Sequence, residues 1–568
     1  MIIDDLVACF GLLTRRQKRD FLIVVVAMSM AALMELLGVA VVIPLVSILI
    51  DYEAAISSGV LRSVHLFLGG PEKELFLMVV MLSGVLMVFT SGAVTIISIY
   101  LNQRYLKRIN AELSTKIYIK FMSQNLAEFH SRSSAEFARN VNGVSERVSQ
   151  GVIGVTIIIA SRAFQVLFVA AVLLYVNAAV ASAVVSIITI SYVSVFILVR
   201  KRIVLLSNKN FDEVREVQQL VIGSYQGYKS ITIDGLLPLF ADRFHGIKKM
   251  ASRRAANIEV IGAIPKNIIE VVGVSSLLVS AYFIGVKSDN SYAFVSVLGL
   301  FGIAAYRLLP SAQQLYHASN RLIASLAVFR AVSKQWGGDQ YRAADSVPAP
   351  VPTKLDYFRV CNVTYFYGDQ KVYDDLSLEI PLKGIVRISG KSGVGKSTLF
   401  ELLLGLRMPV SGVVLVNDSP LSKIDIKQLW TKISYVSQKG YVFKGSIKSN
   451  VVLNECNIDS NRLNLVANIC GLNTLCSSNV FDPELEVSES GLDLSGGEAN
   501  RLLLARGLYK QSEILMLDEA LASLDPDSAR EILQKISTTF PDRVLLLISH
   551  REEEVPRKGL VTIALSRE

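Results

Sequence analysis

The sequence predicts a multi-domain membrane protein, in which an N-terminal all-α transmembrane domain with six spans precedes an α/β P-loop domain. Long apolar segments are confined to residues 1–330, which predicts the transmembrane domain there. The proline-rich stretch "VPAPVPT" at 347–353 indicates that residues 331–353 are a linker. The stretch "GIVRISGKSGVGKSTLFELLLGL" at 384–406 is typical of a strand, a Gly-rich loop and a helix, so residues 354–568 are the predicted α/β domain.

Apolar segments long enough to span a membrane, which takes about 20 residues, occur six times. Segments 102–150 and 200–255 between them are rich in charge and predict helices that continue into water. Lys and Arg concentrate in these two segments and in "TRRQKRD" before the first span. The positive-inside rule therefore places both termini and both segments in the cytoplasm. The predicted spans are roughly residues 21–50, 75–101, 151–176, 178–199, 256–286 and 291–316.

The stretch "ISSGVLRSVHLFLGG" at 56–70 is amphipathic and too short to cross a membrane. Two interpretations fit this stretch, a helix that lies at the outer interface or a structured loop. Neither interpretation adds a span to the six.

Ionisable residues inside the predicted spans are candidates for cargo contacts, because charge at membrane depth is costly. Lys266 and Glu270 are four residues apart and share one helical face, so they form either an internal pair or part of a cargo site. Arg307 has no evident local partner in the sequence, which favours an anionic cargo. The remaining charges of this kind are Glu35 and Arg162.

The net charge of +9 does not indicate a nucleic-acid partner, because the basic residues mainly flank the apolar spans. The first apolar run is too long for a cleavable secretory signal and lacks a small-residue cleavage site. Five cysteines show no metal-ligand spacing and are predicted to be ordinary buried thiols; they are Cys9, Cys361, Cys456, Cys470 and Cys476.

The stretch "GKSGVGKS" at 390–397 has the pattern of a phosphate-binding P-loop, G-x-x-x-x-G-K-S, between a predicted strand and a helix. Gly390, Gly393 and Gly395 allow backbone N–H groups to converge on phosphates. Lys396 is placed to bridge the β- and γ-phosphates, and Ser397 to hold Mg²⁺.

Two acidic residues follow a predicted buried strand in "EILMLDEALASLD" at 513–525. Asp518 and Glu519 are expected at the carboxyl edge of a sheet, where Asp518 binds Mg²⁺ through water and Glu519 polarises the attacking water. A further predicted strand, "RVLLLISH" at 543–550, ends at His550, within reach of the γ-phosphate.

A second anion site is predicted at "GLDLSGGEANRLLLARGLYK", residues 491–510. Ser495 stands before an apolar helical run, and the start of a helix offers unpaired N–H groups and a partial positive charge. The chain thus carries two phosphate cradles about a hundred residues apart.

The order of these motifs resembles that of an ABC transporter ATPase domain. The resemblance rests on Tyr367, Gly390–Thr398, Gln438 in "ISYVSQKGYVF", "LSGGE" at 494–498, "LMLDE" and His550. With six spans in front, nearly the whole chain resembles an exporter-type half-transporter, which implies the type IV exporter fold and an ATP-hydrolysing translocase with ATP and Mg²⁺ as cofactors.

The resemblance assigns roles to individual residues. It implies that Tyr367 stacks on adenine, that Gln438 touches Mg²⁺ and that Glu489 lies in a cross-talk segment. Glu519, His550, Lys396 and Gln438 are the implied catalytic residues. The residues implied to bind the nucleotide are Tyr367, Gly390, Lys391, Ser392, Gly393, Val394, Gly395, Lys396, Ser397, Thr398, Gln438, Asp518, Ser495, Gly496, Gly497 and Glu498, with Ser397, Gln438 and Asp518 also assigned to Mg²⁺.

The same resemblance explains the two cradles. It implies a homodimer in which the Ser495–Gly497 turn of one copy contacts the ATP held by the Lys396 loop of the other. The sequence departs from the family pattern at Ala522-Ser523-Leu524-Asp525, where a hydroxyl is displaced by one position from the usual Ser-Ala-Leu-Asp. Since no catalytic group is missing, hydrolysis is still expected.

The stretches "AAYRLLPSAQQLYHASNRL" at 304–322 and "AIPKNIIEVVG" at 263–273 resemble PglK-type flippases. This resemblance implies a lipid-linked oligosaccharide or related pyrophosphate-lipid glycan as cargo, contacted by Arg307, Lys266 and Glu270. A guanidinium pairs well with phosphate oxygens. The resemblance to PglK-type flippases also implies a bacterial inner membrane, with the ATPase domain and both termini cytoplasmic.

Other functions remain open at this point. The first alternative is an ABC exporter of a peptide or another small amphipathic compound, followed by a multidrug exporter. An ATP-gated channel is disfavoured, because Glu519 and His550 are both present.

Overall fold

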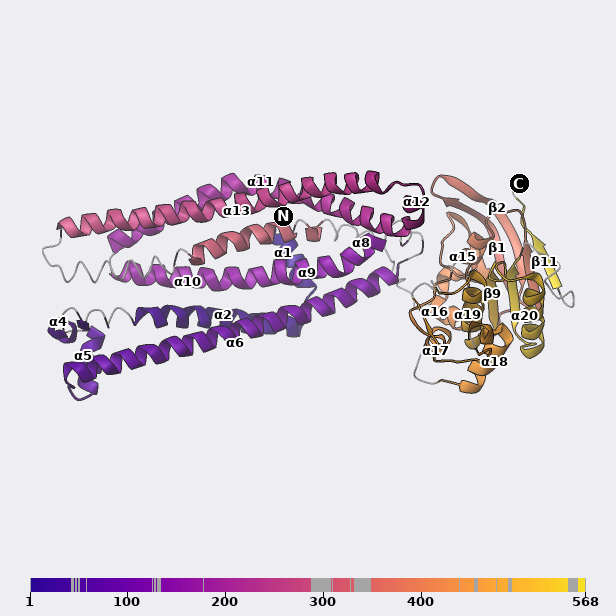
Figure 1. Cartoon of the computed structure of the whole chain (residues 1–568), viewed down its shortest axis with the longest axis horizontal. Coiled ribbons are helices and arrows are strands. Elements are labelled where there is room, and N and C mark those ends of the chain that lie inside the picture. The colour runs from indigo at the N-terminus through magenta and orange to yellow at the C-terminus, as the bar shows by residue number, and fades with distance from the viewer. Residues whose placement is uncertain are drawn as a thin grey trace. The chain divides into compact units, whose positions relative to one another are not determined.

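The computed structural model divides into two compact units (Figure 1). Unit 1 comprises Met1–Gln124 and Phe129–Asp339, and unit 2 comprises Asn125–Glu128 and Gln340–Glu568. The structure describes residues 2–41, 45, 48–49, 52–57, 59–124, 126, 129, 134–176, 178–287, 308, 310–326, 328–330, 349–438, 440–453, 458–476, 478–488, 493–549 and 560–566.

The described part of unit 1 consists of helices joined by short turns. Its longest helices, α6 with 50 residues, α11 with 49 and α13 with 51, are each more than twice as long as the ~30 Å hydrocarbon core of a bilayer requires. Among the described helices, three are long and apolar enough to cross a membrane: Arg15–Gly38, Lys73–Met122 and Glu136–Tyr175. The helices are α1 (Ile2–Gly11), α2 (Arg15–Ala40), α4 (Tyr52–Ser57), α5 (Gly59–Phe67), α6 (Lys73–Met122), α8 (Ser134–Arg139), α9 (Ser145–Val148), α10 (Val155–Val176), α11 (Ala178–Gln226), α12 (Tyr228–Ile233) and α13 (Leu237–Lys287).

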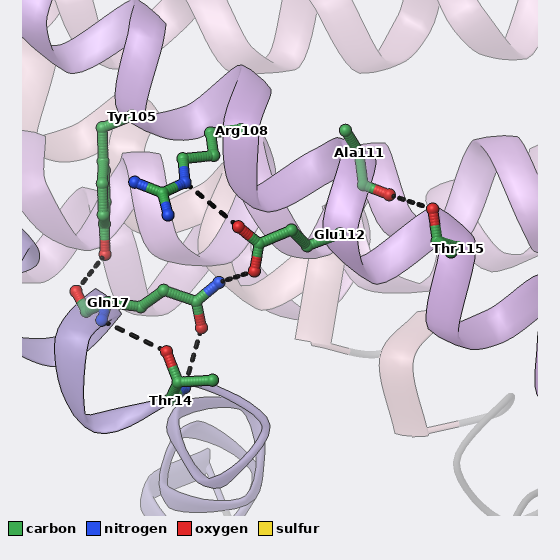
Figure 2. A network of polar contacts seen from close by, with 7 residues as sticks. All are labelled: Thr14, Gln17, Tyr105, Arg108, Ala111, Glu112 and Thr115. Atoms are coloured by element: carbon green, nitrogen blue, oxygen red, sulfur yellow. Dashed lines mark hydrogen bonds and ion pairs between the residues drawn. The ribbon is translucent and has the colours of Figure 1, made fainter.

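Helix α2 lies along α6, and α11 lies along α13 (Figure 1). The α1–α2 junction is fastened to α6 by a polar network around Gln17 (Figure 2). The Gln17 amide nitrogen donates to Glu112 Oε2 at 2.7 Å, and the Tyr105 hydroxyl donates to the Gln17 carbonyl at 3.0 Å. Arg108 Nε donates to the other carboxylate oxygen of Glu112 at 3.1 Å, so both acceptor atoms of this side chain are used.

The helix that leads into α10 is widened by two π-helical turns, Asn140–Val144 and Ser149–Gly154. Helix α10 and the turn before it cover the predicted span 151–176. A Cβ atom on Gly154 would lie 2.8 Å from Leu106 Cδ1, which indicates a close approach to α6. Such wide turns occur where a helix inserts an extra residue without leaving its axis.

The stretch 56–70 contains α5, which follows α4. The Tyr52 hydroxyl donates to the Pro71 carbonyl at 3.2 Å and contacts His65 Nε2 at 3.1 Å. The His65 ring packs edge-on against Phe76, with centroids 5.1 Å apart. Phe67 at the end of α5 leaves 89% of its surface exposed, as the interfacial interpretation expects of an apolar face.

Unit 2 combines a parallel five-stranded sheet, in the order β11-β3-β10-β9-β6, with an antiparallel sheet in the order β2-β1-β4-β5 and a two-stranded pair, β7-β8. Its strands are β1 (Tyr357–Tyr367), β2 (Gln370–Pro381), β3 (Ile385–Ser389), β4 (Ser411–Val416), β5 (Ser419–Pro420), β6 (Ile433–Val436), β7 (Gly445–Ser446), β8 (Glu486–Val487), β9 (Ile514–Asp518), β10 (Val544–Ile548) and β11 (Leu560–Ala564). Its α-helices are α15 (Lys396–Leu403), α16 (Ile426–Lys432), α17 (Ile447–Val452), α18 (Ser460–Cys470), α19 (Gly496–Tyr509) and α20 (Pro526–Thr539).

The parallel sheet is buried on both faces. Leu515 and Leu517 of β9 belong to a core shared with α18, α19 and α20, whereas Ile514 and Met516 belong to a core shared with α15 and β1. Strands covered on both faces read as continuous apolar runs, which is why "ILML" precedes the acidic pair. The segment Asn125–Glu128 joins this unit through the N–H of Leu126, which donates to the Leu406 carbonyl at 3.2 Å.

Candidate functional site

The carboxyl ends of β3 and β9 place the P-loop and the acidic pair at one edge of the parallel sheet. Both strands pair in parallel with β10, which lies between them. Loops at the carboxyl ends of parallel strands form the usual ligand site of α/β folds. The connection after β3 is the stretch Gly390–Gly395, and β9 ends at Asp518.

The P-loop leaves no room for a Cβ atom at two of its glycines. Gly395 has φ +109°, and a Cβ atom there would lie 2.8 Å from the Tyr373 hydroxyl. A Cβ atom on Gly390 would lie 2.7 Å from the Leu565 carbonyl. The Tyr373 hydroxyl donates to the Gly395 carbonyl at 2.6 Å, so this tyrosine fixes the end of the loop where α15 begins. Only glycine, which has no Cβ atom, fits at these two positions without displacing its neighbours.

Lys396 is the first residue of α15, and its side chain lies within the loop with 5% of the residue exposed. Its ammonium donates to the carbonyls of Gly390 at 2.9 Å and Lys391 at 3.1 Å. An ammonium has three donors, so one remains for a phosphate oxygen. Burial lowers the pKa of this ammonium, and the nearby Glu519 and Asp518 carboxylates oppose that shift.

The Asp518 carboxylate is held through both of its oxygens. The Ser397 hydroxyl donates to Oδ1 at 2.9 Å, and the Tyr435 hydroxyl donates to Oδ2 at 3.1 Å. Burial raises the pKa of Asp518, although both hydrogen bonds favour its charged form. Of the three residues predicted to hold Mg²⁺, Ser397 and Asp518 are therefore in contact, whereas Gln438 contacts Glu519.

Glu519 follows directly and has φ +51°, a left-handed conformation that is uncommon for a residue with a side chain. Its N–H donates to the Ile548 carbonyl at 3.2 Å, which fixes the backbone against β10. The Gln438 amide nitrogen donates to the Glu519 carboxylate at 2.5 Å. Strain of this kind persists where the surroundings impose it, and here it aims a carboxylate beside Gln438.

This set of donors fits a magnesium ion bound together with phosphates. Mg²⁺ prefers oxygen ligands and usually takes only one or two from the protein, the remainder coming from phosphates and water. The hydroxyl of Ser397 is such a ligand, and the Asp518 carboxylate beside it is placed to accept from a water bound to the metal. Within the described part of the chain, no group of three or more His, Cys, Asp or Glu side chains forms a self-sufficient metal cage.

The predicted adenine-stacking residue, Tyr367, ends β1 with 55% of its surface exposed. The Arg407 guanidinium lies over its ring, 4.9 Å from the centroid. An exposed aromatic ring at the edge of the site is suited to stacking on a base.

The second predicted cradle is the start of α19, where Ser495 and Glu498 form a capping box. The Ser495 N–H donates to Glu498 Oε2 at 2.7 Å, and the Glu498 N–H donates to the Ser495 hydroxyl at 3.3 Å. These hydrogen bonds lower the pKa of Glu498. The Glu498 carboxylate therefore serves the cap, while Gly496 and Gly497 lie in the first turn, where a helix leaves N–H groups without intrahelical acceptors.

The displaced hydroxyl of Ser523 also contacts this turn. It donates to the Gly496 carbonyl at 3.2 Å and accepts from the Asn500 amide nitrogen at 2.6 Å. The segment after Glu519 is thus tied to the start of α19 in the same chain.

Several predicted residues are not placed by the structure. His550, Glu489 and Arg307 lie outside the described residues, as does the side chain of Lys266, whose backbone belongs to α13. Glu270 is exposed on the same helix. Of the other charges inside the predicted spans, Arg162 lies 3.7 Å from the Glu35 carboxylate.

A family model described as ABC transporter matches residues 373–522. This range contains the P-loop, the Ser495 turn and the acidic pair. Residues 373–522 of the C-terminal unit are thus similar to the ABC transporter family in sequence. The predicted α/β P-loop ATPase domain is therefore confirmed.

The fold of the whole chain is similar to that of a solved bacterial Atm1-family ABC exporter with ATP bound. The TM-score is 0.79 at 17% identity, over 95% of this chain and 94% of that chain. The chain thus has the fold of that exporter, a helical unit followed by a unit that contains the P-loop. The predicted fold class is confirmed.

Curated relatives are similar to part of the chain in sequence. The mycobactin import ATP-binding/permease protein IrtB of Mycolicibacterium smegmatis is 31% identical over 209 residues, 37% of this chain and 36% of that protein. A putative export ATP-binding/permease protein of Rickettsia typhi is 32% identical over 205 residues, 36% of each chain. The chain thus spans little more than a third of the length of these relatives. The ATP-dependent lipid A-core flippase of Burkholderia pseudomallei is 23% identical over 472 residues, 82% of this chain and 78% of that protein.

Sequence reasoning missed Tyr435, Tyr373 and Arg407 in the ATPase domain. Tyr435 stands three residues before Gln438, and its strand β6 pairs with β9 in the register Tyr435 with Met516. That pairing brings its hydroxyl to Asp518. The available signal was a residue with a hydroxyl group near the carboxyl end of a buried strand. It indicates a contact with Asp518 only when the strand order is known.

Proposed function

We propose that two copies of this chain form an ATP-driven transporter in which hydrolysis at the Lys396–Asp518–Glu519 site drives movement of a cargo across the membrane. The observation that carries the proposal is the contact of Ser397 with Asp518 and of Gln438 with Glu519, in a chain that has an exporter fold.

The ATPase residues have distinct roles in this proposal. Lys396 neutralises charge on the β- and γ-phosphates through its free donor. Ser397 and Asp518 hold Mg²⁺, which supplies charge neutralisation at the phosphates when bound. Glu519 orients and polarises the attacking water, and Gln438 positions the Glu519 carboxylate. His550 is assigned to the γ-phosphate.

The dimer follows from the second cradle. The first turn of α19, with Gly496 and Gly497, is proposed to face the γ-phosphate bound by the Lys396 loop of the other copy. Two nucleotides then join the ATPase domains, and loss of the γ-phosphate releases them. A ligand bound only by the closed state shifts the population toward that state.

The proposed cargo is a lipid-linked oligosaccharide or related pyrophosphate-lipid glycan. Similarity to a lipid A-core flippase over 82% of the chain supports a lipid with a glycan head group. Arg307, Lys266 and Glu270 are proposed to contact the head group. The proposed location is a bacterial inner membrane, with the ATPase domain and both termini in the cytoplasm.

Reconstitution in liposomes tests this proposal. The full chain is combined with a lipid-linked oligosaccharide, a lipid A-type lipid or a peptide, and ATP hydrolysis and cargo movement are measured for each. We expect the lipid-linked oligosaccharide to stimulate hydrolysis and to be moved in the wild type but not in Glu519→Gln. Stimulation by the peptide alone would contradict the lipid cargo, and hydrolysis by Glu519→Gln at the wild-type rate would contradict the site.

A further inference from the structure

A buried cation lies beneath the exposed ring proposed to stack on adenine. Arg407 follows the P-loop helix by four residues and leaves 6% of its surface exposed. Its guanidinium carbon is 4.9 Å from the centroid of the Tyr367 ring and 5.8 Å from that of Tyr365. Tyr365 itself is buried, whereas Tyr367 is half exposed.

Burial decides which face of the Tyr367 ring the cation covers. Because the guanidinium is almost fully enclosed, the ring face against it is the inward one. The exposed area of Tyr367 then belongs to the outward face and the ring edge, where a ligand can approach. Arg407 and a stacked base would therefore lie on opposite sides of one ring.

Two contacts hold the guanidinium in place. The Tyr365 hydroxyl accepts from Arg407 Nη1 at 2.9 Å, and the Glu401 carboxylate accepts from Arg407 Nε. Glu401 lies on α15, the helix that begins at Lys396. The cation is thus attached both to the strand that carries Tyr367 and to the helix that starts at the P-loop.

We propose that Arg407 is a positioning residue for the nucleotide base, which fixes the Tyr367 ring from its inner face and strengthens stacking on its outer face. The inference rests on the proposed nucleotide binding. A cation over one face of an aromatic ring is attracted by its negative quadrupole, and the attraction is strongest where water is excluded. It withdraws electron density from the ring, which favours stacking of an electron-rich purine on the other face.

Attachment to both elements also has a geometric effect. The base and the phosphates of one nucleotide must be bound at a fixed separation. Arg407 connects the base platform to the helix of the P-loop through Glu401, so the two halves of the site are preorganised together.

The test measures ATP affinity of the full-length chain in nanodiscs, in a Glu519→Gln background so that bound ATP persists. Arg407→Met is combined with Glu401→Gln, because the Glu401 carboxylate would destabilise the domain once it loses the Arg407 guanidinium. Glu401→Gln alone is the reference. We expect Arg407→Met to weaken ATP binding by about three- to tenfold relative to that reference.

Inorganic tripolyphosphate with Mg²⁺ is the probe that lacks a base. Its affinity should be unchanged by Arg407→Met, and this result also shows that the P-loop is folded. Tyr367→Ala should weaken ATP binding by about 5- to 100-fold, and adding Arg407→Met to it should cause no further loss. Lys371→Met is the matched control. The Lys371 ammonium lies 5.9 Å from the centroid of the neighbouring Phe366 ring, so this variant removes a cation from a different ring of the same strand.

The outcomes separate the two proposals. If Tyr367→Ala weakens ATP binding but Arg407→Met leaves it unchanged or tighter, the inference is overturned. Tighter binding would mean that the guanidinium lies on the ring face where the base stacks. Equal losses for ATP and tripolyphosphate would also overturn it. If Arg407→Met does not fold, Tyr365→Phe removes the orienting hydroxyl and should weaken ATP but not tripolyphosphate binding by about twofold; no effect there contradicts the inference. If Tyr367→Ala leaves the ATP affinity unchanged, the proposed adenine site is refuted instead.

Discussion

Replacing Lys396 by methionine should remove most of the nucleotide-dependent stabilisation without destabilising the unliganded protein. Methionine fills a similar volume but carries no charge. Burial lowers the pKa of the Lys396 ammonium, which shows that its charged form is disfavoured in the folded loop. Removing the ammonium therefore offsets the loss of its hydrogen bonds to the Gly390 and Lys391 carbonyls, and we expect the free energy of unfolding to change by less than about 1 kcal/mol.

The effect on ATP is far larger. A hydrogen bond from a charged group contributes about 1.5–3 kcal/mol, so loss of the Lys396 donor should weaken binding by about 10- to 150-fold. At a ligand concentration of 100 times the wild-type Kd, the wild type gains about 2.7 kcal/mol, whereas a variant with 100-fold weaker binding gains about 0.4 kcal/mol. For an ATPase domain of this size these gains correspond to rises in Tm of about 5–11 °C and about 1–2 °C.

Thermal unfolding of the full chain with and without a non-hydrolysable ATP analogue measures both quantities. Lys383→Met is the matched control, because the Lys383 side chain is exposed and is not among the residues predicted to bind the nucleotide. A full ATP-dependent rise in Tm for Lys396→Met would refute the reasoning, as would a large loss of Tm in the unliganded variant.

Three other substitutions test neighbouring parts of the site. Glu519→Gln should bind ATP with wild-type affinity but hydrolyse it about 10²- to 10⁴-fold more slowly, since the carboxylate that polarises water is lost; a phosphate-release assay that finds ordinary turnover would exclude this role. Tyr435→Phe removes the 3.1 Å hydrogen bond to Asp518 and should raise the Mg²⁺ concentration needed for half-maximal hydrolysis by about tenfold, which a Mg²⁺ titration at saturating ATP measures; an unchanged midpoint would count against it. Gly395→Ala should cost about 1–3 kcal/mol and weaken ATP binding, because the new Cβ would lie 2.8 Å from the Tyr373 hydroxyl at a φ of +109°. Gly393→Ala shares a positive φ, +77°, but has nothing within 4 Å of its Cβ and should cost less; equal losses would contradict the steric explanation.

Local patterns in the sequence were sufficient to predict the fold class. The apolar run before Asp518 predicts a strand buried on both faces, and β9 has cores on both sides. The glycines of 390–395 predict a loop around phosphate, and the structure puts Gly395 at a left-handed φ. These features depend on neighbours in the chain, so the order of residue types contains them.

Contacts between distant segments could not be predicted in this way. Tyr435 reaches Asp518 only because β6 lies beside β9, although 83 residues separate the two in sequence. Arg407 reaches Tyr367 because the segment after α15 returns beneath the end of β1. The hydrogen-bond partner of the displaced Ser523 hydroxyl, the Gly496 carbonyl, likewise depends on how the segment after β9 packs on α19. Each case requires the strand order and helix packing, which periodicity does not specify.

The central claim is that one nucleotide is held by the Lys396 loop of one copy and the Ser495 turn of another. Cysteines introduced at the exposed positions Ser392 and Ser495, in the Glu519→Gln background, test it directly by disulfide formation in nanodiscs. The account predicts a covalent dimer of twice the 62.3 kDa chain mass that forms with ATP and Mg²⁺ and is lost when Lys396→Met is added. Cross-linking within a single chain, or a dimer whose yield is independent of ATP, would contradict it.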